Sequence, residues 1–408
     1  MKPRAHALKI SAVVGGVLLL CLVAAWFMWA ASADRAVDAK LQELEEAGYA
    51  TNLARLAPSM PADEDNAAAL YDEAFAGFPT ELEGYWGAVL GRLASTPEEF
   101  AAALTDEERS GLGTFFEDHA REFELLDEAA ARPRCVFARD YSKGYEILLP
   151  QTSRVILTCK ILAARALLQA SSGDASGAAR TIEAIFATAG CCGEEPILVS
   201  QLVRIVGMGI GLDVLQSVLS SMELPPEALK RIRDRLDPDA LMAGVRLAYR
   251  GELAFAASFV RELRGDPGAA TGLGVEVPAV LDSALARPLL NEDFVLLLDT
   301  QARMIEAAEK PYPEAAPALA AIDAEIQANV DWRHPFTGML VYAVGPSQAN
   351  AVKRQSRLVL ARAAIEVLLT GELREPPIDP MTGMPIQVDA EDGVLSSGGG
   401  ETWRLRRP

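Results

Sequence analysis

Apolar residues recur at helical spacing along most of the chain. Leu112, Phe116, Phe123 and Leu126, for example, share one face of a helix with a period near 3.6 residues. The segment that carries them begins at Thr105–Glu108, a capping box that satisfies free backbone groups of the first turn. This pattern predicts a mainly α-helical protein.

The middle of the chain predicts a helical hairpin. A first helix covers about 153–170, Gly173 ends it, and Asp174 begins a second helix that reaches Ala189. The pair resembles one unit of a helical-repeat array, but no second copy follows at a fixed period, so no solenoid is predicted. Farther on, Gly207 and Gly211 lie one helical turn apart. Their spacing favours close crossing of two helices over a dinucleotide-binding loop.

The N-terminus departs from this pattern. Ile10–Ala33 is an uncharged stretch of about 24 residues, and about 20 suffice to cross a bilayer as a helix. Trp26 and Trp29 lie near its far end, where interfacial aromatic residues are enriched. Three basic residues come before the stretch: Lys2, Arg4 and Lys9. The sequence therefore predicts a signal-anchor in the inner (cytoplasmic) membrane, with a cytoplasmic N-terminus and an extracytoplasmic body.

A cleaved signal peptide is the alternative. Ala31-Ser32-Ala33 fits a cleavage site with small residues, although the apolar stretch is longer than the roughly 7–15 residues of a typical signal peptide. Both interpretations place the acidic remainder of the chain outside the cytoplasm.

The C-terminal region changes character. Pro376, Pro377 and Pro380 make it extended, and Ile386–Val388 and Val394–Ser396 flank Asp392-Gly393, a turn typical of β-hairpins. We therefore expect a small C-terminal β-hairpin on an extracytoplasmic multi-helix body. Four consecutive regions are expected: the anchor at 1–33, a helical region at 34–150, a helical-hairpin core at 151–371, and the β-hairpin and tail at 372–408.

Charge and composition exclude several functions. The 408 residues carry 57 acidic and 38 basic side chains, a formal net charge of −19, which argues against nucleic acid as a partner. With 3 His and no CxxC or HExxH motif, common zinc sites lack their ligands. No cofactor is predicted. The predicted partners are the lipid bilayer, through Ile10–Ala33, and a protein of the cell envelope.

Three stretches resemble uncharacterised, membrane-anchored helical bacterial proteins of the planctomycete type. They are Asp63–Phe75, Gly173–Arg204 with its Glu195-Pro196 and Gln201–Arg204 motifs, and Asp379–Gly398. The resemblance implies an anchored helical protein and carries no activity with it.

The turn Asp379-Pro380-Met381-Thr382-Gly383-Met384-Pro385 is also similar to a C-terminal turn of type II secretion pseudopilins. The rest of the pilin signature is absent, so the similarity is that of a local turn. By analogy it offers oxygen donors for Ca²⁺, which are Asp379, Asp389 and Asp392. The alternative is a turn fixed by proline and glycine, with solvated acids.

Two histidines are candidates for a pocket. His119 has Glu117, Asp118 and Glu122 nearby in sequence, but it also falls on the apolar stripe between Phe116 and Phe123. That position favours a packed core residue over a base or a metal ligand. The second candidate is the loop Trp332-Arg333-His334, whose side chains could line a pocket or pin the loop to the body.

The cysteines of the predicted extracytoplasmic body are candidates for a disulfide. They are Cys135, Cys159, Cys191 and Cys192. Four cysteines allow three pairings, and Cys135 could reach the Cys191-Cys192 corner.

No catalytic motif stands out, so the sequence favours a partner-binding or scaffolding protein of the cell envelope. Two alternatives remain. One is an envelope hydrolase or other enzyme with a site near Trp332, Arg333 and His334 or near His119. The other is an accessory role beside a secretion or pilus-like apparatus.

Overall fold

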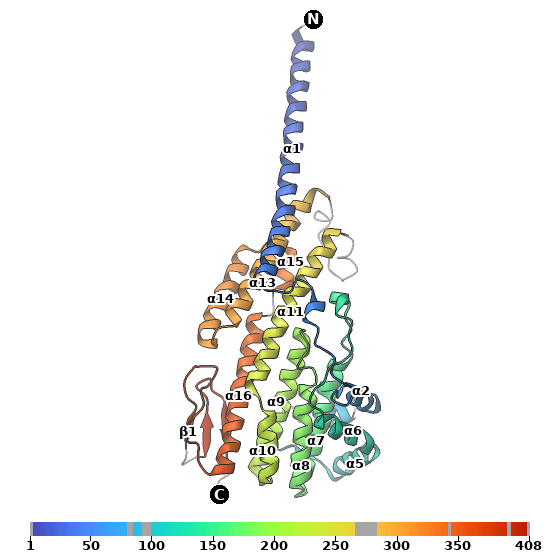
Figure 1. The fold of residues 1–408 in the computed structure, drawn as a ribbon, viewed down its shortest axis with the longest axis vertical. Helices are drawn as coiled ribbons and strands as arrows, with labels where there is room; N and C mark the ends of the chain where they lie inside the picture. The colour runs from blue at the N-terminus through green and yellow to red at the C-terminus, as the bar shows by residue number, and fades with distance from the viewer. Residues whose placement is uncertain are drawn as a thin grey trace. The chain divides into compact units, whose positions relative to one another are not determined.

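The computed structural model describes residues 3–79, 85–91, 99–265, 284–341, 344–389 and 393–405. Within these ranges the chain is mainly helical, with a small antiparallel sheet near its C-terminus and an apolar helix at its N-terminus (Figure 1). The predicted fold class is confirmed.

The residues pack into two compact units that do not follow the order of the sequence. The first unit comprises Met1–Asn52, Leu253–Met304 and Ala321–Ala343, and the second comprises Leu53–Glu252, Ile305–Ala320 and Val344–Pro408. This partition differs from the four consecutive regions expected from the sequence. A shift in composition along the chain cannot reveal that a later segment returns to an earlier one.

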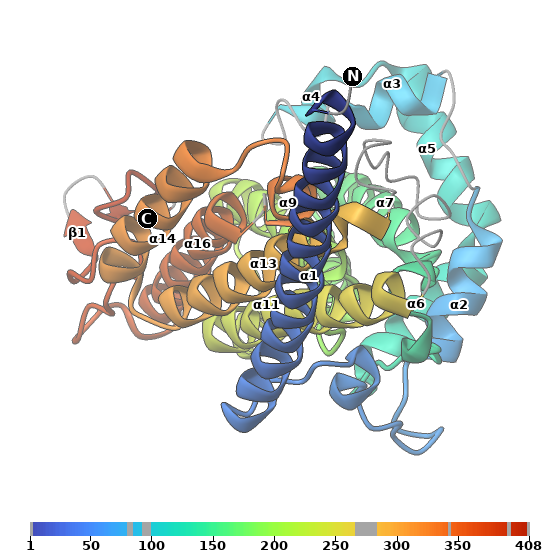
Figure 2. The ribbon, with the colours of Figure 1, turned by 90° about the horizontal axis from the view of Figure 1, so that it is seen from above.

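The helices of the second unit precede and follow its central hairpin. Those before it are α2 (Ala68–Gly77), α3 (Tyr85–Gly91), α4 (Phe100–Ala103), α5 (Asp106–Asp118) and α6 (Ala120–Ala131). The hairpin and its continuation are α7 (Gln151–Ser171), α8 (Ala175–Gly190), α9 (Leu198–Ser221) and α10 (Pro226–Arg235). Helix α16 (Val344–Thr370) follows later in the chain. Figures 1 and 2 show α2 and α6 side by side, and the two helices pack on each other.

Two sequence signals set the helix ends as expected. Thr105 accepts a hydrogen bond from the Glu108 N–H and Glu108 closes the capping box at the start of α5. Gly173 adopts a φ of 82°, and the Asp174 side chain caps α8 by accepting from the Gly177 N–H at 2.9 Å. The helix predicted from Thr105 is broken at His119, whose backbone dihedrals (φ −108°, ψ 26°) separate α5 from α6.

The second unit is built around the packing of α7, α8 and α9. The glycines of α9 allow this close approach, because a Cβ at Gly207 would lie 2.7 Å from the Cβ of Ala189 and one at Gly211 would lie 2.6 Å from the Phe186 ring. The expected close helix crossing is therefore present. Helix α9 is apolar and long enough to span a bilayer, but 72% of its apolar window is buried, as in a core helix.

The C-terminal element contains the predicted β-hairpin, and a third strand extends it to a three-stranded sheet. Strands β1 (Gln387–Asp389), β2 (Val394–Ser396) and β3 (Thr402–Arg404) pair antiparallel in the order β1-β2-β3. Leu395 opposes Trp403 in the register, and both side chains are buried. The third strand escaped prediction because it is short and follows a glycine-rich segment that reads as a flexible tail.

The first unit contains α1 (Pro3–Glu46) together with α15 (Pro335–Leu340). It also includes parts of three longer helices, which are α11 (Pro238–Gly265) from Leu253, α13 (Arg287–Ala308) to Met304, and α14 (Tyr312–Asn329) from Ala321. The α1 residues Ala33, Val37, Leu41 and Leu44 recur at helical spacing and are all buried. Buried Asp293 on α13 fixes the start of α15 by accepting the N–H groups of Phe336 (2.8 Å) and Thr337 (3.1 Å).

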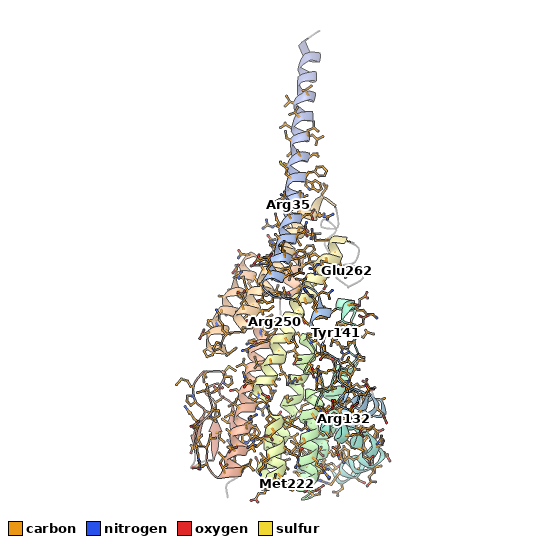
Figure 3. All side chains as sticks on the ribbon, in the orientation of Figure 1. Arg35, Arg132, Tyr141, Met222, Arg250 and Glu262 are labelled. Carbon is orange, nitrogen blue, oxygen red and sulfur yellow. The ribbon has the colours of Figure 1, made fainter. Side chains whose placement is uncertain are left out.

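The N-terminal half of α1 does not have a buried apolar face like that of the C-terminal half. From Val13 to Met28 most of its large apolar side chains are exposed, for example Leu20 at 70% and Leu22 at 68%. Figure 3 shows these side chains on the helix before Arg35, which is labelled. One continuous helix therefore changes at Ala33 from exposed apolar surface to an amphipathic face packed in the first unit.

Candidate functional site

His119 is packed among aromatic rings. Its ring lies 4.2 Å from that of Phe115 and 5.6 Å from that of Phe78, measured between centroids. Its Nδ1 lies 2.9 Å from the Phe115 carbonyl oxygen. Glu117 and Asp118, its acidic neighbours in sequence, are exposed. These contacts are those of a structural residue, in agreement with the helical-stripe interpretation.

The Trp332-Arg333-His334 loop belongs to the first unit, whereas His119 belongs to the second. Trp332 is 61% exposed. Arg333 pairs with Asp331 at 2.8 Å, and this contact lowers the pKa of the Asp331 carboxyl to about 2. That carboxylate, which also lies 3.3 Å from His334 Nδ1, is therefore committed to an ion pair within the loop. The loop is held by its own side chains.

The acidic turn at the C-terminus uses Asp379 internally. This residue is fully buried, and its carboxylate accepts hydrogen bonds from the Ser356 hydroxyl, the Met381 N–H (3.1 Å) and the Thr382 hydroxyl (2.9 Å). Asp389 is exposed on β1, and Asp392 lies outside the described residues. No cluster of three or more acidic, His or Cys side chains able to hold a metal occurs in the described part of the chain. Asp379 therefore stabilises the turn through protein hydrogen bonds.

All five cysteines lie in the described part of the chain, and all carry free thiols. The expected disulfide is thus not present in this structure. Cys191 Sγ lies 3.8 Å from Cys192 Sγ, far beyond the roughly 2.05 Å of an S–S bond. Cys135 is a neighbour of the Cys191 thiol, whose pKa is raised by burial and by its contacts with Cys135 and Cys192. Cys159 is buried, with its Sγ near the Ile185 carbonyl oxygen at 3.9 Å.

A buried ion pair lies beside the thiols. Arg139 Nε donates to Glu195 Oε1 at 2.6 Å, and the two side chains are only 3% and 4% exposed. Arg139 Nη1 also donates to the Leu148 carbonyl at 2.9 Å, and the Ser200 hydroxyl donates to the second Glu195 oxygen. The pair ties the segment after α6 to the corner between α8 and α9.

The same corner is held by Gln201. Its Nε2 donates to the carbonyl oxygens of Cys192 (3.1 Å), Gly193 (3.1 Å) and Glu195 (3.0 Å). Ser200, Gln201 and Arg204 form a polar stripe in the first part of α9, where the other residues from Leu198 to Leu212 are apolar or glycine, and all three are buried. Such a stripe in a core helix marks a specifically constructed polar site.

Arg204 is the unusual member of this stripe. Its Nη1 donates to the Ala240 carbonyl at 3.1 Å, while its Nε is buried and has no hydrogen-bond partner. Burial lowers the pKa of Arg204, with the Asp237 carboxylate acting in the opposite direction. A Cβ at Gly193 would lie 3.3 Å from the guanidinium carbon, and one at Gly244 would lie 2.8 Å from Nη1. Two glycines therefore make the room that the guanidinium occupies.

Arg204 lines a cavity of about 320 Å³ in the second unit. Its buried lining includes Tyr71, Phe186, Cys191 and Met208. Four exposed residues also line it: Pro133, Asp234, Asp237 and Ala240. Figure 3 labels Arg132, another lining residue, on the segment after α6. The cavity combines an apolar wall, thiols and a buried cation.

A second cavity of about 660 Å³ also lies in the second unit. It is lined by Arg233 and Glu366, which pair with each other at 3.1 Å, and by Arg362, which donates to the Leu236 carbonyl at 2.8 Å. Because these three charged side chains already have protein partners, they are less available to a ligand than Arg204 is.

Sequence reasoning passed over Arg139 and noted Glu195, Gln201 and Arg204 only as parts of a resemblance. The signal that could have found them is the polar stripe within an apolar helix. The comparisons with known proteins add no residue to this site: no family model, no curated protein and no solved structure matches the chain.

Glu252 gives a pH-dependent prediction. Its carboxylate accepts the Leu198 N–H at 3.1 Å, but burial dominates and raises its pKa above the ordinary value of 4.5. The folded protein therefore holds this proton more tightly than the unfolded chain, and ionisation of Glu252 as pH rises above 4.5 lowers the stability. Gln keeps the acceptor oxygen and has no charge. We expect Glu252→Gln to raise Tm at pH 8 more than at pH 4, measured by thermal unfolding. An equal shift at both values would contradict this assignment.

Proposed function

We propose that the protein is a single-pass membrane protein whose helical body acts as a binding module in the cell envelope. Ile10–Ala33 would lie in the bilayer, the basic residues before it in the cytoplasm, and the body on the other side. The observation that carries this proposal is the exposed apolar half of α1.

The length and exposure of that half support a membrane span. About 24 helical residues at 1.5 Å each give a length of about 36 Å, enough for a hydrocarbon core of about 30 Å with some tilt. The apolar window has a mean hydropathy of 2.3 and none of it is buried. Exposed apolar surface on this scale is costly in water, and lipid removes that cost.

Two tryptophans support the position of the interface. Trp26 Nε1 donates to the Leu285 carbonyl at 3.1 Å, and Trp29 Nε1 donates to Glu292 Oε1 at 2.8 Å. Leu285 is itself 71% exposed. Rings with an apolar body and a bonded polar tip are suited to the membrane surface, so this end of the first unit would rest against the headgroups.

The continuity of α1 favours the anchor over the cleaved signal. The helix runs through Ala31-Ser32-Ala33, and Ala33 is buried at 6% exposure. Val37, Leu41 and Leu44 continue the same packed face. The packed face of α1 thus begins at Ala33 itself, and cleavage after Ala33 would remove a residue of this face.

Charges in the middle of the apolar stretch test the anchor. We expect the double variant Leu18→Arg/Leu22→Arg to abolish retention in alkaline-washed membranes, because each central Arg costs about 2.5–3.5 kcal/mol on insertion. The matched control is Gln42→Arg, which places the same charge on an exposed position of the same helix. Retention of the double variant at the level of the control would refute the proposed span.

A further inference from the structure

We propose that the Arg204 cavity binds a small carboxylic acid with a compact apolar body, its carboxylate held by Arg204 and Arg235. This site rests on the proposed role of the body as a binding module, but it does not depend on the membrane anchor. Both arginines line one cavity together with Tyr71, Phe186 and Met208.

Two cations of the cavity lack an acidic partner. Among the described residues Arg204 bonds only the Ala240 carbonyl and the Gln201 amide oxygen, and Arg235 bonds only the Ala130 carbonyl. The Asp237 carboxylate offsets only part of the cost of burying Arg204, because burial still lowers the pKa of the guanidinium and the two side chains form no direct hydrogen bond among the described contacts. A bound anion would supply the missing charge and an acceptor for the unpartnered Arg204 Nε.

The acids that line the same cavity are engaged elsewhere. Glu194 pairs with Arg134, its Oε1 accepting from Arg134 Nε at 2.9 Å. Asp234 pairs with Arg233 at 3.2 Å. Asp237 caps α11 by accepting the N–H groups of Asp239 and Ala240, each at 2.9 Å. Arg132, the remaining charged residue of the lining, pairs with Glu128 at 3.1 Å. Arg204 and Arg235 therefore remain the cations available to a ligand.

The Cys191 thiol and the Tyr71 phenol of the cavity do not compete with an anion. Burial raises the pKa of the Cys191 thiol and that of the Tyr71 hydroxyl, so both groups are neutral at physiological pH. The positive charge of Arg204 is thus not offset by a Cys191 thiolate or a Tyr71 phenolate.

The site is built rather than incidental. Gly193 and Gly244, from two different elements, leave space that a Cβ would fill, and Gln201 fixes the corner that carries Gly193. The guanidinium is thereby held in position before any ligand arrives, which reduces the entropy lost on binding. The volume of about 320 Å³ is at the lower end of the range for small-molecule sites.

The apolar wall specifies the rest of the ligand. Phe186 and Met208 are buried, and Ala67, Ala129 and Ala130 add small apolar surfaces. Inorganic phosphate would use the cations and leave this wall uncovered. A monocarboxylate with a short aliphatic or aromatic body would use both.

The direct test is isothermal titration of the full-length protein in detergent with straight-chain, branched and aromatic monocarboxylates, hexanoate among them. We expect saturable binding of at least one acid, and at least tenfold weaker binding of its amide, of acetate and of inorganic phosphate. Arg235→Gln should weaken binding at least tenfold. The matched control on the same helix is Arg231→Gln, whose partner Glu183 lies outside the cavity lining. It should bind normally.

Arg204→Met separates a ligand-binding arginine from a structural one. Arg204 leaves two acceptors when it is replaced, the carbonyl of the exposed residue Ala240 and the Gln201 amide oxygen, whose contact at 3.5 Å is long and weak. We therefore expect the variant to unfold at the same or a higher temperature than the wild type while losing the acid-dependent rise in Tm. A lowered Tm would show that Arg204 is structural and would overturn the proposal.

Other outcomes would also overturn it. These are the lack of saturation by every acid at about 10 mM, equal binding of an acid and its amide, and tighter binding of phosphate than of any carboxylate. Failure of the anchor would appear as loss from the membrane fraction and would leave these titrations unchanged, so the two proposals fail separately.

Discussion

Glu195→Ala is expected to lower the free energy of unfolding by about 3–5 kcal/mol. The substitution removes the only carboxylate bonded to buried Arg139 among the described residues and leaves the Ser200 hydroxyl without its acceptor. An unpaired charge in the core destabilises the folded protein much more than an exposed one, because no water replaces the lost partner.

The adjacent residue provides a matched control. Glu194 also pairs with an arginine, Arg134, but these side chains are 39% and 34% exposed. Water can solvate Arg134 after Glu194→Ala, so we expect the free energy of unfolding to fall by about 1 kcal/mol or less. Denaturant titration of both variants in detergent, followed by circular dichroism, measures the difference. Similar losses for the two neighbours would contradict the assignment of Arg139–Glu195 as a buried structural pair.

Gly251→Ala is the second variant with a large expected effect. An added Cβ on α11 would collide with the Pro196 carbonyl oxygen, a backbone atom that cannot rotate away. Pro196 lies in the corner that also carries Glu195 and Cys192, so relief of the collision would displace this polar cluster. We expect the free energy of unfolding to fall by about 1–3 kcal/mol or more, measured by the same denaturant titration.

Replacing a glycine by alanine at an open position should change the free energy of unfolding in the opposite direction. Gly113 lies inside α5, and a Cβ there would meet no atom within 4 Å. Gly113→Ala should therefore stabilise the protein by about 0.5–1 kcal/mol, because Ala is the better helix former. A neutral or stabilising effect of Gly251→Ala, like that expected for Gly113→Ala, would contradict the close approach of α11 to Pro196.

Local signals in the sequence predict local structure well. The capping box at Thr105, the turn at Gly173-Asp174 and the glycine pair Gly207 and Gly211 each act within one or two helical turns. Their physical cause lies in neighbouring residues, so a single sequence reveals it. The apolar Ile10–Ala33 stretch is equally visible because it is continuous.

Features made by distant residues were not predictable in this way. Arg139 and Glu195 come from separate segments, and the Arg204 cradle needs Gly193 and Gly244 from different elements. The third strand is defined by the pairing of Trp403 with Leu395, which lies on the other side of the glycine-rich segment. The residues around Trp403 alone do not indicate this pairing. The interleaving of segments in the two units has the same origin.

The candidate residues predicted from the sequence also differ in whether their contacts are distant or local. Cys135 and Cys191 meet as thiols, and the structure leaves them free. His119 packs among aromatic rings, as its place on an apolar stripe favours. The Trp332 loop and the Asp379 turn are instead held by their own hydrogen bonds and ion pairs.

The most direct test of the central claim determines topology and processing together. Spheroplasts of a bacterial host expressing the full-length protein with a C-terminal epitope are treated with external protease, and the membrane-bound species is sized on the same gel. We predict an uncleaved, full-length membrane protein whose C-terminal epitope is digested from outside. An epitope protected in the cytoplasm, or a soluble species released by cleavage after Ala33, would contradict the proposed anchor.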